Sequence, residues 1–209
     1  LPPKGSAPCE DVGVTKRRRA LLIVDMQRDF AHPGGSLFIP GAPGIVPALI
    51  GLIEEARREG VPVVWSQDWH PARTPHFEAY GGIWPEHCVA GTPGAELLPE
   101  LTALVAPEDI IIRKGVSGED GYSAFTVRNL LTEVEQPTKL NVQLQERQIE
   151  LITIAGVAVD WCVRASALDA LAAGYAVEVV TRATAGVNLQ PGDSATALAE
   201  IAAAGGVIH

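Results

Sequence analysis

Three polar side chains of this sequence stand at or just beyond the ends of apolar runs, and their chemistry is complementary. Asp25 follows the run 20–24, Lys114 closes the run 109–113, and Cys162 lies where another strand is expected to lead into a helix. In an open α/β sheet the carboxyl ends of parallel strands border the ligand crevice, so we expect the three side chains to meet there. A thiol nucleophile, a carboxylate base and a cation in one crevice predict a cysteine hydrolase.

A cysteine thiol is mostly protonated at neutral pH, so Cys162 needs an activating environment. A helix that begins near Trp161 would direct free N–H groups toward the sulfur and lower its pKa. Asp25 could accept the thiol proton while Lys114 stabilises the charges, and the N–H groups of Cys162 and Ala158 are candidates for an oxyanion hole. Taken singly, such residues are more often a packed thiol, a loop cap and a surface lysine, but their joint position favours catalysis.

A second polar group lies in the long stretch 67–93. Asp68 and His70 are two residues apart, so on an extended backbone they project to the same side. His76 and His87 follow, and one carboxylate with two or three imidazoles can bind Zn²⁺, Fe²⁺ or Mn²⁺ and leave positions open for water or substrate. The alternative is that these histidines bond backbone groups and that Asp68 caps a turn; spacing alone does not decide between the two.

Length, composition and charge restrict the class of protein. The 209 residues, 47% hydrophobic and 20% charged, fit one α/β hydrolase domain over 20–209 behind an extended arm, 1–19. The net charge of −9 opposes affinity for nucleic acid or anionic membrane, and the basic run 16–19 is too short to reverse this. Three scattered cysteines, with no export signal or membrane span in evidence, indicate a reducing compartment, so we expect a cytoplasmic protein.

The elements that must position these side chains alternate along the chain. Strands are expected at 20–24, 61–66, 109–113, 149–154, 175–181 and 207–208, and helices at 47–59, 161–173 and 193–205, the last capped by Asp193. This order predicts a three-layer, doubly wound α/β sheet of about six mostly parallel strands with helices on both faces. The stretches 26–44 and 67–93 exceed ordinary loop lengths and are expected to be functional. The stretch 129–148 reads as helical with a break at Pro137.

Taken together, the motifs resemble those of the isochorismatase-like cysteine hydrolases, and within them the nicotinamidase/pyrazinamidase branch. The matching pieces are VDMQRDF at 24–30 with GSL at 35–37, QDWHP at 67–71, WPEHCVAGT at 84–92, KG at 114–115, YSAF at 122–125 and the run 156–163. They stand in the family's order and extend from about residue 20 to the end of the sequence. The segment 84–92 is similar to nicotinamidases in particular.

The resemblance implies a catalytic triad, a metal site and an activity. The triad would be Asp25, Lys114 and Cys162. One divalent metal ion, Zn²⁺ in the first place and Fe²⁺ or Mn²⁺ as alternatives, would be held by Asp68, His70, His87 and, as a fourth candidate, His76. The implied reaction is hydrolysis of nicotinamide to nicotinate and ammonia through a thioester, with pyrazinamide as a further substrate.

The same resemblance implies a flat aromatic pocket. Phe30 and Trp84 would sandwich the ring of the small-molecule substrate, with Tyr122 nearby. It also implies a cis peptide between Val157 and Ala158, next to the oxyanion hole. Members of the family often form dimers or larger assemblies, so a homo-oligomer is expected.

Two departures from the family pattern leave the substrate open. The family's Ala-Thr-Asp-Tyr-Cys reads Ala-Val-Asp-Trp-Cys at 158–162, so Trp161 is expected to reshape the pocket mouth, and the segment 126–148 is longer than usual. The main alternative is a metal-free amidase or ureidohydrolase of the superfamily that acts on a carbamoyl or maleamate-like substrate. A non-catalytic α/β binding module is a third interpretation.

Overall fold

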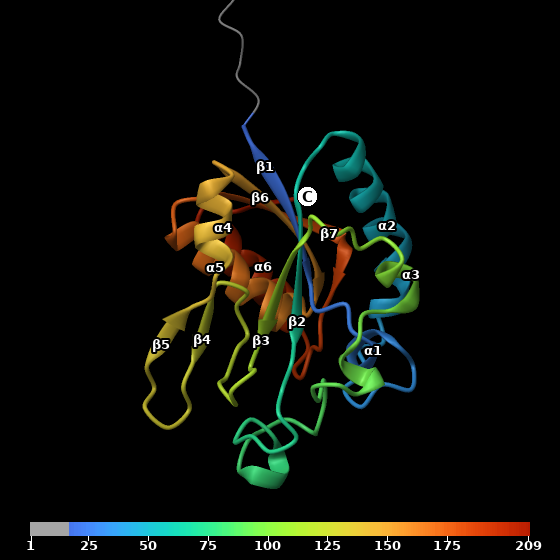
Figure 1. The fold of residues 1–209 in the computed structure, drawn as a ribbon, viewed down its shortest axis with the longest axis vertical. Coiled ribbons are helices and arrows are strands. Elements are labelled where there is room, and N and C mark those ends of the chain that lie inside the picture. Colours follow the sequence, from blue (N-terminus) through green and yellow to red (C-terminus); the bar gives the residue numbers. More distant parts are fainter. Residues whose placement is uncertain (1–16) are drawn as a thin grey trace, which may run out of the picture.

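Six parallel strands form the central sheet of the computed structural model, which describes residues 17–209 (Figure 1). They are β1 (Arg19–Val24), β2 (Val63–Asp68), β3 (Ile110–Lys114), β6 (Leu151–Val157), β7 (Ala176–Ala185) and β8 (Val207–Ile208). The order is β3-β2-β1-β6-β7-β8, and each neighbouring pair is parallel. The predicted fold class is confirmed. Most of the predicted arm 1–19 lies outside the described residues, and β1 begins at its end.

The order of the strands fixes where a ligand can bind. The chain moves outward from β1 to β2 and β3, then crosses to the far side of β1 and moves outward again through β6, β7 and β8. The sheet therefore reverses its direction of growth between β1 and β6. In doubly wound sheets the crevice opens at this point, beyond the carboxyl ends of the strands.

Helices cover both faces of the sheet (Figure 1). The longer helices are α2 (Ala42–Arg58), α4 (Leu140–Glu146), α5 (Arg164–Ala172) and α6 (Asp193–Ala203). Two short helices are α1 (Arg28–Ala31) and α3 (Pro99–Thr102). Single turns of other kinds are the 3₁₀ turns Glu78–Tyr80 and Pro93–Ala95 and the π-helical turn Val159–Val163. None of the helices in the described range is long and apolar enough to cross a membrane.

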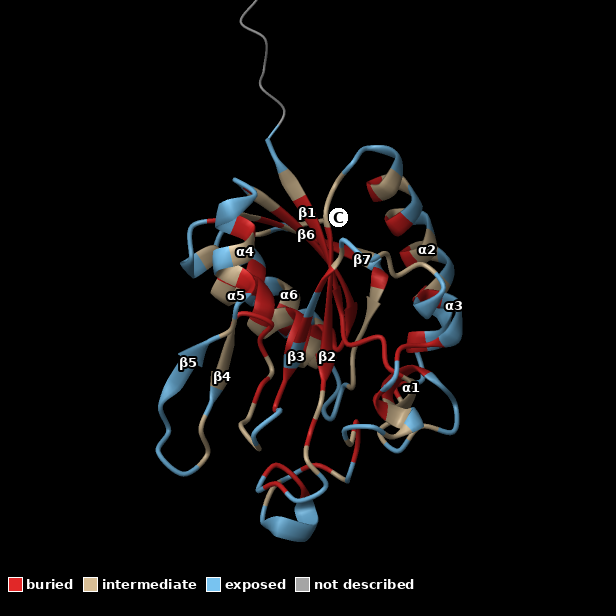
Figure 2. Ribbon diagram, in the orientation of Figure 1, coloured by how far each residue is buried: buried red, intermediate tan, exposed pale blue. Residues whose placement is uncertain are grey.

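Two hydrophobic cores follow from the period-two alternation of β1. Leu21 and Ile23 face the core that includes α2 and α3, whereas Leu22 and Val24 face the core that includes α4, α5 and α6. All four side chains are at most 3% exposed, and burying an aliphatic side chain of this size contributes about 1.5–3 kcal/mol. Figure 2 shows the strands as a buried centre between helices whose outer faces are exposed.

The boundaries of several helices and strands differ from those predicted. The helix predicted at 47–59 begins at Ala42, which places Pro47 inside α2, and the strand predicted at 61–66 runs two residues further, to Asp68. The final helix begins at Asp193 as predicted, but its N-cap is Gly192; the Asp193 carboxylate instead accepts a hydrogen bond from the Gln190 N–H. The shift in β2 matters for function because it puts Asp68 level with Lys114 in the sheet.

The prediction for 129–148 is wrong in its first half. A two-stranded hairpin, β4 (Thr126–Arg128) and β5 (Glu135–Pro137), precedes α4 and extends away from the sheet (Figure 1). The apolar residues with helical spacing have no core to face, since Leu131 is 87% exposed. Asn129 instead accepts hydrogen bonds from the N–H groups of Leu131 and Thr132, which stabilises a turn at the expense of a helix.

The close approach of β1 and β6 gives a test of this packing. Gly156 has φ +117°, and a Cβ on it would lie 2.2 Å from the Val24 carbonyl oxygen. Replacing Gly156 with Ala should therefore lower the free energy of unfolding by at least about 2 kcal/mol in urea denaturation. The matched control is Gly51→Ala on the exposed side of α2. A Cβ added there would have no atom within 4 Å apart from the backbone of its own helix and its chain neighbours. The control should stabilise the protein by about 0.5–1 kcal/mol, and equal effects of the two changes would contradict the packing described.

Candidate active site

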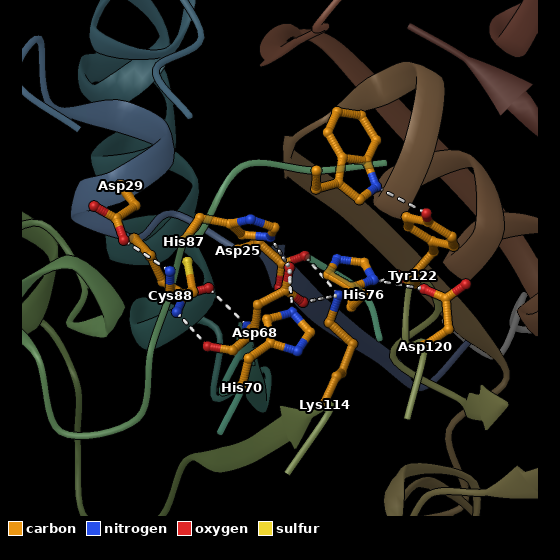
Figure 3. A network of polar contacts seen from close by, with 12 residues as sticks. Asp25, Asp29, Asp68, His70, His76, His87, Cys88, Lys114, Asp120 and Tyr122 are labelled. Atoms are coloured by element: carbon orange, nitrogen blue, oxygen red, sulfur yellow. Dashed lines mark hydrogen bonds and ion pairs between the residues drawn. The ribbon is translucent and has the colours of Figure 1, made fainter. Parts of the chain in front are cut away.

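The three predicted catalytic side chains meet at the carboxyl edge of the sheet. Figure 3 shows two of them, Asp25 and Lys114. Lys114 Nζ lies 2.7 Å from Asp25 Oδ2 and 2.9 Å from Asp68 Oδ1. The ligand atoms of Asp25, Asp68 and Cys162 all lie within 4.8 Å of one another. Lys114 is 0% exposed, Asp25 1% and Cys162 7%, so the charges interact away from water.

Each of these side chains is delivered by the end of a different strand. Asp25 follows β1 with a left-handed φ of +48°, an unusual conformation for a non-glycine residue, and its Oδ1 accepts a 2.7 Å hydrogen bond from Ser66 Oγ on β2. Lys114 is the last residue of β3 and also donates to the Tyr122 carbonyl oxygen. Cys162 lies in the π-helical turn that follows β6.

Burial and the central ammonium set the protonation of the carboxylates. Burial raises the pKa of Asp25, and Lys114 only partly opposes this effect. Burial acts on Asp68 as well, but there Lys114 and the neighbouring His70 and His87 prevail and hold the pKa well below its usual value. The two carboxylates outweigh burial at Lys114 and raise its pKa well above normal. Asp25 is therefore the carboxylate that accepts a proton more readily.

The expectation that a helix end lowers the pKa of Cys162 is wrong. Burial raises the pKa of this thiol well above its usual value, and the carboxylates of Asp25 and Asp68 add to the effect although Lys114 opposes it. The thiol is therefore protonated at neutral pH. A nucleophile in this state requires a base within reach, and Asp25 is the carboxylate in that position.

The predicted metal ligands also converge. Asp68 Oδ2 lies 3.8 Å from His70 Nε2 and 3.7 Å from His87 Nε2. Ligand bonds of about 2.1 Å in a tetrahedral site separate the donor atoms by roughly 3.4 Å, so these three atoms approach the spacing of a metal site. The ligand nitrogens of His70, His76 and His87 lie within 4.8 Å of one another, and all three rings are buried.

The surroundings of the His70 ring indicate whether a cation fits between these ligands. Within residues 17–209, neither of its ring nitrogens has a hydrogen-bond partner, although the residue is only 1% exposed. Gly115 lies against the ring, where a Cβ would come within 2.4 Å of His70 Nδ1, so a residue with a side chain at this position would displace the ring. A buried imidazole without partners is costly unless Nε2 binds a cation. The donor set of one carboxylate and neutral imidazoles suits a divalent ion.

Sequence analysis missed Gln27, whose side chain holds Asp68 in place. Its Nε2 donates to the Asp68 carbonyl oxygen at 2.6 Å and to the Ala95 carbonyl oxygen at 2.8 Å, while its Oε1 accepts from the Asp68 N–H at 2.7 Å. The residue is completely buried. The only signal in the sequence is its place two residues after Asp25, in the motif at 24–30.

Sequence analysis also missed two carboxylates outside the metal set. Asp29 Oδ2 accepts a 2.7 Å hydrogen bond from the N–H of Cys88, the residue after His87, and thereby ties α1 to the stretch 67–93. Asp120 Oδ1 lies 3.1 Å from His76 Nδ1. Figure 3 shows Asp29 and Asp120 on opposite sides of the site. Asp29 lies in α1 and in the motif at 24–30, which is its only signal in the sequence, whereas nothing in the local sequence distinguishes Asp120 from other loop aspartates.

A small pocket, with a cavity volume of about 30 Å³, opens beside Cys162. Its wall is mostly apolar or aromatic and includes Phe30, Leu37, Ile39, Trp84, Tyr122, Val157, Ala158, Trp161 and Val187. Trp84 Nε1 donates a 2.9 Å hydrogen bond to Tyr122 Oη, and the Trp161 ring lies edge-on to Trp84 at 4.8 Å. The predicted substrate-binding aromatics thus share one cavity with the thiol. The predicted cis peptide between Val157 and Ala158 is present.

Known proteins resemble this chain in sequence and in architecture. Residues 19–209 match the family described as the isochorismatase domain. A protein of Escherichia coli named nicotinamidase is 37% identical, over 91% of this chain and 94% of that protein. A zinc complex of a Pyrococcus horikoshii pyrazinamidase is 36% identical with a TM-score of 0.81, over 92% and 98% of the two chains. An L. infantum protein in complex with nicotinate is 34% identical with a TM-score of 0.81, over 92% of each. The chain therefore belongs to the isochorismatase family.

Proposed function

We propose that this chain is a metal-dependent nicotinamidase, which hydrolyses nicotinamide to nicotinate and ammonia and also accepts pyrazinamide. The proposal depends on the position of Asp68 between the catalytic groups and the histidines. One of its carboxylate oxygens lies 2.9 Å from Lys114 Nζ, and the other lies 3.7–3.8 Å from the Nε2 atoms of His87 and His70. Nucleophile, base and metal ligands thus border one aromatic pocket. The names of the E. coli and P. horikoshii relatives and the nicotinate bound to the L. infantum protein support the same substrate class.

The first half of the reaction forms a thioester. Asp25 accepts the proton of the Cys162 thiol, and the sulfur attacks the carboxamide carbon of the substrate. The N–H groups of Ala158 and Cys162 donate to the oxygen that becomes negatively charged. Asp25 then returns the proton to the leaving nitrogen, and ammonia departs.

Hydrolysis of the thioester uses the same carboxylate. Asp25 accepts a proton from a water molecule, whose oxygen attacks the acyl carbon. The C–S bond then breaks, the acid is released, and Asp25 returns the proton to the Cys162 thiolate. Lys114 stays charged throughout and compensates the negative charge that moves between Asp25 and Cys162. A divalent cation held by Asp68, His70, His87 and His76 would act as a Lewis acid that withdraws electron density from the substrate ring.

The residues of the pocket wall support a flat heteroaromatic amide as the substrate. Phe30 and Trp84 are 6% exposed or less, and both line the cavity, so they can contact the two faces of a ring. The hydrogen bond to Tyr122 fixes the plane of Trp84. The alternative of a metal-free amidase leaves the buried Nε2 of His70 without a partner, which makes it the less favourable interpretation.

Replacing Cys162 with Ala should abolish ammonia release from nicotinamide, with a loss of at least about 10³-fold in kcat, because no thioester can form. Binding of Zn²⁺ should persist, since the sulfur is not among the proposed ligands. The matched control is Cys88→Ala, which removes the other buried thiol and leaves the nucleophile in place. Turnover by the Cys162 variant would refute the assignment.

Removal of metal should abolish turnover. The purified protein is expected to contain about one equivalent of Zn, Fe or Mn, and dialysis against a chelator should bring ammonia release from nicotinamide down to the blank. Adding back Zn²⁺, Fe²⁺ or Mn²⁺ should restore it. Full activity of a protein that elemental analysis finds free of metal would instead support the metal-free alternative.

A further inference from the structure

Asp120 lies in the loop between β3 and β4, outside the residues assigned to the reaction. Its Oδ1 is 3.1 Å from His76 Nδ1, and its side chain is 11% exposed. This oxygen accepts no well-aligned hydrogen bond from any described residue, so His76 is the group placed to satisfy it. Figure 3 shows the imidazole of His76 between Asp120 and the other histidines.

The position of Asp120 bears on which nitrogen of His76 can bind a cation. A neutral imidazole has one N–H and one lone pair, and a carboxylate beside Nδ1 favours the tautomer with the proton on that nitrogen. The lone pair then lies on Nε2. His87 is held in the same way, because its Nδ1 lies 2.8 Å from the Pro85 carbonyl oxygen, which can only accept. His76 differs in that its outer partner is charged.

The β4–β5 hairpin holds Asp120 in position. The N–H of Asp120 donates to the Arg128 carbonyl oxygen at 2.8 Å, and the N–H of Arg128 donates to the Asp120 carbonyl oxygen at 2.7 Å. The guanidinium of Arg128 adds a 3.5 Å contact to Asp120 Oδ2. The hairpin itself is attached to α5, because Thr126 Oγ1 donates to Asp169 Oδ2 at 2.7 Å.

We propose that Asp120 is a positioning residue that fixes His76 as a metal ligand, and that the β4–β5 hairpin serves to hold Asp120 there. This inference rests on the metal site of the proposed function and extends it. Outer-shell carboxylates of this kind fix the tautomer and the orientation of a ligating imidazole and increase its basicity. None of the strand residues of this hairpin is buried, so its attachment to Asp120 and α5 gives the first part of the segment 126–148 a role.

The test compares metal binding by three proteins. Asp120→Asn keeps the size of the side chain and removes its charge, and Glu135→Gln removes a charge from an exposed position on the same hairpin as the control. Dissociation constants for Zn²⁺ are measured by competition with a chelator. Asp120→Asn should bind Zn²⁺ about 10–100-fold more weakly than the unaltered chain, and Glu135→Gln should bind within about twofold of it.

A second measurement separates positioning from folding. At saturating Co²⁺, the visible absorption spectrum of Asp120→Asn should differ from that of the unaltered chain, because the ligand field changes when His76 moves. An unchanged spectrum, or Zn²⁺ affinity within about twofold of the unaltered chain, would overturn the role of Asp120 and leave the proposed function in place. Failure of the unaltered chain to bind either Zn²⁺ or Co²⁺ would overturn both.

Discussion

The buried ammonium of Lys114 is the interaction on which the rest of the site depends. It is shielded from solvent and lies within 2.9 Å of a carboxylate oxygen on each side. Removing one partner from a buried ion pair costs about 3–5 kcal/mol, so Asp25, Asp68 and Lys114 stabilise one another as a set. One cation between two carboxylates leaves an excess of negative charge, which favours a further cation beside Asp68. The proposed catalytic and metal-binding groups are therefore electrostatically coupled.

The order of the strands makes this set possible. β3, β2 and β1 are neighbours, and they end in Lys114, Asp68 and the residue before Asp25. An ammonium group that starts on β3 must cross two strand spacings, about 10 Å, to meet a side chain beyond β1. The long stem of Lys114 and the side chain of Asp25, which the left-handed backbone turns toward the lysine, span this distance together. Cys162 approaches from β6, on the other side of β1, so the sulfur faces the base across the point where the sheet reverses.

The sequence predicts the parts of the site that strand ends supply and misses the parts that tertiary contacts supply. Asp25 and Lys114 close apolar runs, and Asp68 stands near the end of another, so the rule for parallel sheets brings them together. Asp120 carries no such signal, because its role depends on a hairpin that returns the chain to it. That hairpin was itself predicted as helix, since Leu131 and Val134 have helical spacing but remain exposed. The raised pKa of Cys162 likewise follows from burial among carboxylates and not from its position at a helix start.

The supports of the proposed metal ligands come from two parts of the chain, the segment 24–30, which holds Gln27 and Asp29, and the loop before β4, which holds Asp120. Gln27 holds the backbone of Asp68 from the β1 side, Asp29 holds the residue after His87 through α1, and Asp120 faces His76 from the hairpin side. Each support acts on a different ligand or its neighbour, so the donor atoms are oriented before a cation arrives. Such preorganisation lowers the cost of ordering the ligands at the moment of binding. The long stretch 67–93 can therefore carry three histidines outside the sheet and still present them to one point.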